Sequence, residues 1–381
     1  MPDRPCAIFG RCLFVGLFSL LSSCALFRPP EPGIGKEIPW SKVDGWKQDN
    51  HQEAWPALLS SCEALQQKPI WDRVCSAAGA VSEPDQQTAQ EFFETWFAPH
   101  VVHGSKRKTK GLITGYYEPL LYGSFEPSDR YRYPLYARPE SLLIIDLGDR
   151  FPELRNQRLR GRLTGNKVIP YFSRAEIEAD RELLQGNELV WLDNRDDVFF
   201  LHIQGSGRIQ LPDGRIVGVG YSDQNGHPYH AIGRTLVERG ELELDQVSLF
   251  SIKQWLREHA DQAEDLLNQN PSYIFFVLRE DPGQGPIGSL NVPLTAERSI
   301  AIDPELINLG TPMWLSTHYP GDSDKPLKKL VFAQDTGGAI KGHLRADLFW
   351  GHDRDAEQAA GTMKSPGSLI VLLPKQHQDQ E

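Results

Sequence analysis

The sequence lacks the short signatures that identify many enzymes. It contains no H-E-x-x-H, no C-x-x-C, no phosphate-binding loop and no G-x-S-x-G nucleophile elbow. Its five cysteines fit no zinc spacing, and its 11 histidines form no ligand-like pair on one predicted helix face. The sequence therefore favours neither a metal centre nor a serine nucleophile, and we expect no metal and no organic cofactor.

A surplus of basic residues is also missing. The 381 residues include 40 Lys and Arg against 51 Asp and Glu, which gives a net charge of −11. Because nucleic-acid binding needs positive charge to neutralise phosphates, we expect no nucleic-acid partner. The 40% hydrophobic content argues against disorder. At roughly 100–200 residues per domain, the length predicts two domains.

No apolar run is long enough to span a bilayer. The longest, residues 12–21 (CLFVGLFSLL), has ten residues and fits the apolar core of a signal peptide. It ends in Leu21-Ser22-Ser23-Cys24, which resembles the lipobox of bacterial lipoproteins. We therefore predict a signal peptide over 1–23, a lipidated Cys24 and a Pro-rich tether over 24–40. A plain secretory signal with a chance cysteine is the alternative.

The lipobox sets the expected location. Ala25, in place of Asp, follows the cysteine, which by resemblance to enterobacterial sorting favours the periplasmic face of the outer membrane. The chain would be anchored to the membrane by lipid without spanning it. Cys62 and Cys75 then remain as an even pair in an oxidising compartment. They form either a disulfide or two separately buried thiols.

The pattern of apolar residues is helical over 43–97 and then becomes β-like. We predict strands at 112–117, 198–204, 273–278, 312–316, 329–334 and 368–373, and helices at 230–238 and 251–268. The short strands with Gly and Pro turns after residue 271 are typical of a small closed barrel.

The strongest candidate for chemistry is Asp335. It follows the apolar strand LVFAQ and precedes Thr336-Gly337-Gly338. Burial among apolar neighbours would raise the pKa of this carboxyl, as a general acid requires. Gly337 and Gly338 would let a substrate approach closely. Two alternatives are a simple turn that ends a strand and an aspartic protease, which would need a second Asp-Thr-Gly from a dimer partner.

Seven ordered motifs extend the argument beyond Asp335. They are GYYEP (115–119), HIQGSG (202–207), VGY with NG (219–221 and 225–226), NPSY (270–273), IAIDP (300–304), DTGGAIKG (335–342) and DLFWG (347–351). In this order they resemble the membrane-bound lytic murein transglycosylase A family. The resemblance covers about residues 111–374, and the N-terminal helical part carries little of it.

The resemblance implies a mainly β, α+β fold in two domains. Residues 41–121 and 271–375 would form a double-psi β-barrel with N-terminal helices, and residues 122–270 an inserted domain, with a glycan groove between them. The implied partner is the peptidoglycan glycan strand, and a monomer is expected. Of three barrel aspartates, Asp335 would be the catalytic acid and base, and Asp303 and Asp347 would support it.

The implied reaction cleaves the MurNAc-β-1,4-GlcNAc bond without water and leaves 1,6-anhydromuramoyl ends. One carboxyl serves both proton transfers because the nucleophile is intramolecular. Two alternatives remain. Asp347 as a second carboxyl would make the protein a muramidase that hydrolyses the bond. A wall-binding lipoprotein without catalysis would not need Asp335.

Other residues are candidates for substrate binding. Tyr116 and Tyr117 alternate faces of a strand, and we favour Tyr117 as the ring that faces the glycan. Gln204 and Ser206, at the end of the predicted strand 198–204, would hold N-acetyl or lactyl groups, or merely cap a turn. Lys341 would pair with substrate carboxylates or stabilise the aspartates.

Overall fold

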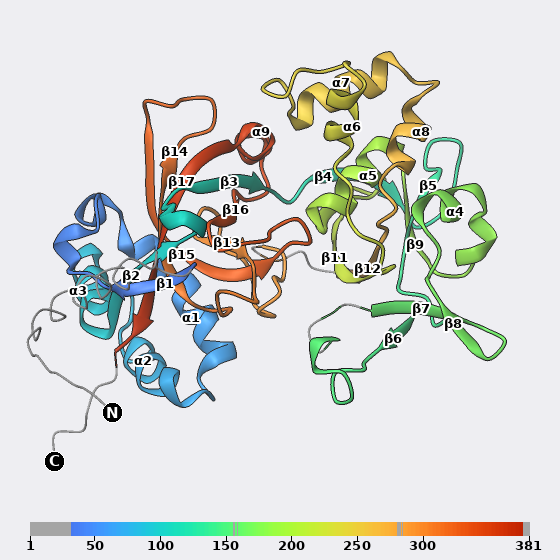
Figure 1. Ribbon diagram of the computed structural model, residues 1–381. Helices are drawn as coiled ribbons and strands as arrows, with labels where there is room; N and C mark the ends of the chain where they lie inside the picture. The colour runs from blue at the N-terminus through green and yellow to red at the C-terminus, as the bar shows by residue number, and fades with distance from the viewer. Residues whose placement is uncertain (1–31, 155–156, 158, 280–282, 284, 376–381) are drawn as a thin grey trace, which may run out of the picture.

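The structure is a computed structural model that describes residues 32–154, 157, 159–279, 283 and 285–375. It contains two β-rich parts that lie side by side (Figure 1). One is a barrel with helices packed on its outside, and the other is a domain inserted between two barrel strands. Cys24 and the predicted signal peptide lie outside the described residues. None of the described helices has both the length and the apolar character needed to cross a membrane.

The barrel closes because its first and last strands pair with each other. Its strands run in the order β17-β14-β15-β13-β16-β3, and β3 pairs again with β17. Two neighbouring pairs, β13 with β15 and β16 with β3, are parallel. The strands are β3 (Gly111–Tyr116), β13 (Ser299–Ile302), β14 (Pro312–His318), β15 (Pro326–Thr336), β16 (Arg345–Phe349) and β17 (Lys364–Pro374).

The outer strands and the helices cover the barrel. β1 (Gly33–Glu37) and β2 (Phe97–His103) extend its sheet beyond β17. Helices α1 (Trp55–Leu65), α2 (Pro69–Gly79) and α3 (Gln86–Trp96) pack on its outside, where Trp314 and Phe332 share one buried cluster with them. Helix α9 (Arg354–Thr362) packs near β3. Cys62 of α1 and Cys75 of α2 form a disulfide, the first of the two predicted alternatives.

The inserted domain is built on a second sheet with the strand order β12-β11-β10-β4-β9-β5. These strands are β4 (Leu120–Ser124), β5 (Tyr133–Tyr136), β9 (Glu188–Leu192), β10 (Ser206–Gln210), β11 (Ile216–Gln224) and β12 (Ile274–Arg279). A small sheet contains β6 (Leu143–Ile145), β7 (Leu159–Thr164) and β8 (Lys167–Ile169). The helices are α4 (Arg174–Ala179), α5 (Arg195–Gln204), α6 (Ile232–Glu238), α7 (Leu249–Glu258) and α8 (Ala263–Asn268).

The structure differs from three expectations about this domain. β12 pairs with β11 in the second sheet, so the inserted part does not end at residue 270 but includes Ile274–Arg279. Residues 198–204 are not a strand but the body of α5. The Asn194 side chain caps this helix by accepting from two backbone N–H groups, and Gly205 ends it with a left-handed φ of 80°. The long predicted helix 251–268 is divided into α7 and α8.

An ionic cluster fixes the two parts where the chain crosses between them. Glu118, fully buried just after β3, pairs with Arg208 of β10 at 2.8 Å and with Arg279, at the end of β12, at 3.6 Å. Its backbone N–H also donates to the carbonyl of Gly351 in the barrel. The chain passes from the barrel to the inserted domain after β3 and returns after β12, and the Glu118 carboxylate pairs with residues at both places. These ion pairs hold the inserted domain against the barrel.

Candidate active site

Asp335 lies one residue before the end of β15, as the apolar run predicted. In the sheet register, Ala301 of β13 is opposite both Asp335 of β15 and Asp347 of β16. Cross-strand partners point to the same face, so both carboxyls flank the small side chain of Ala301. Two strand spacings, about 9–10 Å in total, separate their backbones.

Four hydrogen-bond donors hold the Asp335 carboxyl. The Tyr116 hydroxyl donates to Oδ2 at 2.9 Å. The backbone N–H and the hydroxyl of Ser289 donate to Oδ1 at 3.0 and 2.9 Å, and the Thr336 N–H donates to the same oxygen at 2.9 Å. Burial nevertheless raises the pKa of Asp335, although these hydrogen bonds oppose the shift. Because Oδ1 accepts three donors, Oδ2 is the oxygen best able to carry a proton.

Apolar side chains surround this carboxyl on the protein side. Tyr116, Leu294, Ala301, Ile340 and Phe349 form one buried cluster. They exclude water from one side of Asp335, which disfavours its anion. The other side remains accessible, since Asp335 itself is only half-buried. The site therefore has the environment expected for a general acid that a substrate can reach.

The two glycines after Thr336 differ in their surroundings. A Cβ on Gly337 would lie 2.7 Å from Cγ1 of Ile340, so this glycine permits the loop to pack on the apolar cluster. A Cβ on Gly338 would meet no atom within 4 Å. Only Gly338 thus adjoins open space, as the expectation of a close substrate approach requires.

Asp347 is the second acidic group on this face. Thr114 of β3 donates to its Oδ1 at 2.5 Å. Burial raises the pKa of Asp347, the Thr114 hydrogen bond and the charge of Arg345 oppose this shift, and the charge of Asp335 adds to it. Asp347 is therefore held in a network and is electrostatically coupled to Asp335.

Asp303, the third predicted aspartate, has a different environment. It is buried just after β13, and its Oδ2 accepts from the Gly342 N–H at 2.8 Å. Its Oδ1 lies 3.5 Å from the Lys341 ammonium, which also lies 3.6 Å from Glu305. Asp303 thus fixes the loop that follows Gly338, and Lys341 pairs with acidic groups of the protein while its side chain stays 58% exposed.

The tyrosine beside the acid is Tyr116, whereas the sequence favours Tyr117 as the ring that faces the glycan. The Tyr117 hydroxyl donates to Glu357 of α9 at 3.0 Å, and its ring belongs to the barrel core. Tyr116 instead contacts Asp335. The Tyr117 N–H donates to Oε1 of Gln204 at 3.1 Å, so Gln204, the last residue of α5, lies beside the same strand.

Ser206 begins β10 opposite Gly220 of β11 and is buried. It and Gln204 therefore flank the helix-to-strand turn at Gly205, where we had expected the end of a strand.

Ser289 is a site residue that the sequence did not reveal. Ser289 lies in a tight turn in which the Gly288 N–H donates to the Val292 carbonyl, and this turn places the Ser289 hydroxyl beside Asp335. A Cβ on Gly288 would lie 2.6 Å from the carbonyl oxygen of Gln334, so only glycine permits this approach. In the sequence, the glycines Gly285 and Gly288 indicate a turn near Ser289, and both lie outside the seven motifs.

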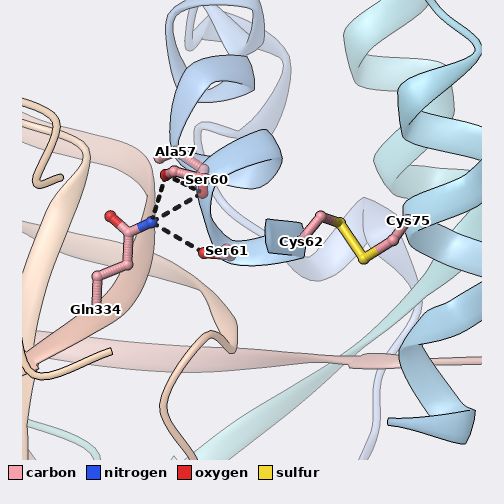
Figure 2. Close-up of a disulfide and its surroundings, with 6 residues drawn as sticks. All are labelled: Ala57, Ser60, Ser61, Cys62, Cys75 and Gln334. Carbon is pink, nitrogen blue, oxygen red and sulfur yellow. Dashed lines mark hydrogen bonds between the residues drawn. A yellow bond between two sulfur atoms is a disulfide. The ribbon is translucent and has the colours of Figure 1, made fainter. Parts of the chain in front are cut away.

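Gln334, the neighbour of Asp335, joins β15 to the N-terminal helices (Figure 2). Its amide nitrogen donates to the carbonyl of Ala57 and to the hydroxyls of Ser60 and Ser61, at 2.8 to 3.1 Å. Figure 2 shows that the Cys62–Cys75 disulfide continues from this same end of α1 to α2. The helices thereby brace the strand that carries the acid.

Within the residues that the structure describes, no group of three or more His, Cys, Asp or Glu side chains gathers as metal ligands. The groups that contact Asp335 are the Tyr116 and Ser289 hydroxyls and the backbone amides of Ser289 and Thr336.

Two family models match the chain. The model described as "MltA specific insert domain" matches residues 112–277, and the model described as "3D domain" matches residues 298–373. The chain is 31% identical to the membrane-bound lytic murein transglycosylase A of Escherichia coli K12 over 267 residues. That match spans 68% of this chain and 65% of the relative, slightly less than two thirds of its length.

Solved structures extend the likeness to nearly the whole chain. The membrane-bound lytic murein transglycosylase from Agrobacterium tumefaciens has a TM-score of 0.80 and 31% identity, covering 90% of this chain and 98% of its own. The structure of Escherichia coli MltA with bound chitohexaose has a TM-score of 0.66 and 25% identity, covering 90% and 94%.

Proposed function

The chain belongs to the membrane-bound lytic murein transglycosylase A family, and from its site we propose that it cleaves peptidoglycan glycan strands as a lytic transglycosylase. The observation that carries the proposal is Asp335. It is half-buried, its pKa is raised by burial, and its Oδ2, which accepts one hydrogen bond against three at Oδ1, is the oxygen best able to carry a proton.

The proposed reaction uses Asp335 twice. Protonated Asp335 donates its proton to the oxygen between C1 of N-acetylmuramic acid and N-acetylglucosamine, and the C1–O bond breaks. The muramoyl C6 hydroxyl oxygen forms a bond to C1 and gives its proton to the Asp335 carboxylate. The products are a 1,6-anhydro end and a free N-acetylglucosamine end, and no water is consumed. The reaction leaves Asp335 protonated, ready for the next cycle.

The neighbouring groups support these proton transfers. Tyr116, Ser289 and Thr336 stabilise the carboxylate that exists between the two steps, because each donates a hydrogen bond to it. We assign Asp347, whose pKa is raised by burial and by the charge of Asp335, to supporting the acid on the same barrel face, and Asp303 to holding the loop that carries Gly338 and Lys341.

We place the glycan across the barrel face that exposes Asp335, next to the inserted domain. A relative with bound chitohexaose supports a glycan ligand for this fold. Gln204 and Ser206 would contact N-acetyl or lactyl groups there, and Gly338 adjoins open space. Lys341 would exchange its long ion pairs for a substrate carboxylate, since exposed pairs of this kind contribute little stability.

The finer structural and cellular assignments are proposals of the same kind. The two parallel strand pairs support a double-psi connection in the barrel. A lipid on Cys24 would hold the chain, as a monomer, at the periplasmic face of the outer membrane. Cys24→Ser tests the anchor: the variant should leave the membrane fraction, and an unchanged distribution would contradict lipidation at this residue.

One observation favours a second candidate, hydrolysis by two carboxylates. The backbones of Asp335 and Asp347 are two strand spacings apart, about 9–10 Å, and both side chains lie on one face, which leaves room for the carboxyl separation of roughly 6.5–9.5 Å that inverting glycosidases use. The Thr114 hydrogen bond to Asp347 and the nearby charge of Arg345 argue against its acting as a free base.

The proposal is tested by comparing the purified wild-type protein with Asp335→Asn on isolated sacculi. The wild type should release soluble muropeptides, whereas the variant should bind sacculi and release none. If both proteins are folded and both bind without cleavage, the chain is a wall-binding lipoprotein. If the variant cleaves as fast as the wild type, Asp335 is not the acid.

A further inference from the structure

The inserted domain contains a cavity of about 260 Å³ that the proposed reaction does not use. It lies between α4, α5, β5 and α8, at the end of the molecule farthest from the barrel (Figure 1). Its floor is buried and largely aromatic, with Tyr136, Phe199 and Tyr273, and charged side chains from α4 also line it. Its volume is sufficient for an amino acid or the end of a peptide.

Arg174 brings a buried positive charge to this cavity. It is 2% exposed, and its guanidinium lies over the rings of Phe199 and Tyr273, 4.8 and 5.0 Å from their centroids. Its hydrogen-bond partners are neutral: the carbonyls of Asn270 and Ser272, and Nδ1 of His202.

Arg174 has no ion pair with any described residue, and its Nη1 has no partner among them. A buried cation without an anion is unusual, because burial of an unpaired charge is costly.

Glu178 brings the opposite charge to the same cavity. It lies one helical turn after Arg174 on α4, a rise of about 6 Å along the axis. Pairs at this spacing commonly form salt bridges. Among the described residues, however, Glu178 has no ion pair and no hydrogen bond, and it lines the cavity instead.

Burial raises the pKa of Glu178, and nearby Glu264 adds to the shift, although Arg174, Arg181 and Arg195 oppose it. The nearby arginines therefore attract the Glu178 carboxylate without forming an ion pair with it among the described residues.

We propose that this cavity binds an α-amino-acid zwitterion between Arg174 and Glu178. The ligand's carboxylate would accept hydrogen bonds from the guanidinium, and its ammonium would donate to the Glu178 carboxylate. Arg181, Arg195 and Glu264 also line the cavity, so charges of both signs face the ligand and a zwitterion can pair with both. The aromatic floor would receive the ligand's carbon chain and favour its ammonium.

Two sources can supply this chemistry. One is a free amino acid. The other is the zwitterionic side-chain end of the diamino acid in a peptidoglycan peptide, and this choice rests on the proposed function. In that case the inserted domain would bind the peptide attached to a glycan strand, at a distance from the cleaved bond.

The test is direct binding, which does not depend on glycan cleavage. Free meso-diaminopimelic acid and a purified muropeptide are titrated into the full chain and followed by calorimetry. Two derivatives of the free acid serve as paired probes, one with both amines acetylated and one with both carboxyls amidated. We expect saturable binding of the free acid and loss of binding with either derivative. Binding of the muropeptide as well identifies the peptide source, and binding of the free acid alone identifies the free amino acid.

Glu178→Gln keeps the shape of the side chain and removes its charge. Loss of a charged hydrogen bond of roughly 1.5–3 kcal/mol should weaken binding by about tenfold or more. Glu238→Gln, an exposed change on α6 of the same domain, is the matched control and should bind like the wild type. The proposal is overturned if the wild type binds neither the free acid nor the muropeptide, if a blocked derivative binds as tightly as the free acid, or if Glu178→Gln binds as tightly as the wild type.

Discussion

The Tyr116 hydroxyl offers the sharpest test of how the site sets the proton affinity of Asp335. Tyr116→Phe removes one of four donors and keeps the ring, which is 8% exposed within the apolar cluster beside the acid. The lost hydrogen bond stabilises the carboxylate that forms when Asp335 gives up its proton. A hydrogen bond to a charged group contributes about 1.5–3 kcal/mol, so kcat should fall by roughly tenfold to a hundredfold.

The same change has a defined effect on the pH profile. Asp335 must be protonated to start the reaction, so activity should fall as the pH rises through its pKa. The Tyr116 hydrogen bond lowers that pKa against the effect of burial. Its loss should raise the pKa further and move the basic limb of kcat/KM to higher pH.

The assay is the release of muropeptides from sacculi across a pH series. Tyr117→Phe is the matched control, because its hydroxyl contacts Glu357 and not Asp335, and its basic limb should stay in place. A basic limb that stays in place in Tyr116→Phe, or moves to lower pH, would refute this assignment of roles.

Three further predictions concern stability. Asp335→Asn should raise the Tm at neutral pH, because burial destabilises the ionised carboxyl of the folded wild type. This gain should vanish as the pH falls from the raised pKa of folded Asp335 to the pKa of an aspartate in the unfolded chain, which thermal scans at several pH values would show. Replacing Cys62 and Cys75 by serine should lower the free energy of unfolding by about 3 kcal/mol in urea titrations, because the disulfide restricts the unfolded chain across a sequence separation of 13; equal midpoints would contradict this. Arg298→Met should cost about 3–5 kcal/mol in the same assay, because it leaves the buried Asp49 without its bidentate partner; a loss no larger than that of an exposed Arg→Met change would contradict this.

The barrel could be predicted from the sequence where strands are apolar and turns are marked. Runs such as LVFAQ before Asp335 show little alternation between apolar and polar residues, so they indicate strands that are buried on both faces, and Gly, Pro or Asp residues bound them. The predicted strands after residue 311 fall within β14, β15 and β17. Asp335 was identifiable for the same reason, since it stands where such a run ends.

Uniformly apolar segments were less informative. The five residues from Val198 to His202 are all buried and mostly apolar, so no period distinguishes a helix from a strand. The local signals that decide the case are Asn194 before the segment and Gly205 after it, which cap a helix. Tyr116 and Tyr117 pose a similar problem. Alternation along a strand puts their rings on opposite faces, but both residues are buried, so the pattern does not show which ring lies beside the acid.

Contacts between residues that are far apart in the sequence could not be predicted from local sequence patterns. Ser289 donates to Asp335 across 46 residues of chain, from a turn whose sequence is unremarkable. Arg298 and Asp49 pair across 249 residues. Such contacts follow from the closed barrel and its covering helices, and they become visible only when the strands are in register.

The most direct test of the central claim is mass spectrometry of the products released from sacculi in water that carries the heavy oxygen isotope. Intramolecular attack by the C6 hydroxyl predicts muramoyl ends that are lighter by one water and carry no heavy oxygen. Reducing muramoyl ends with heavy oxygen at C1 would contradict the account, because they would show that water is the nucleophile and that Asp335 works with a second carboxyl.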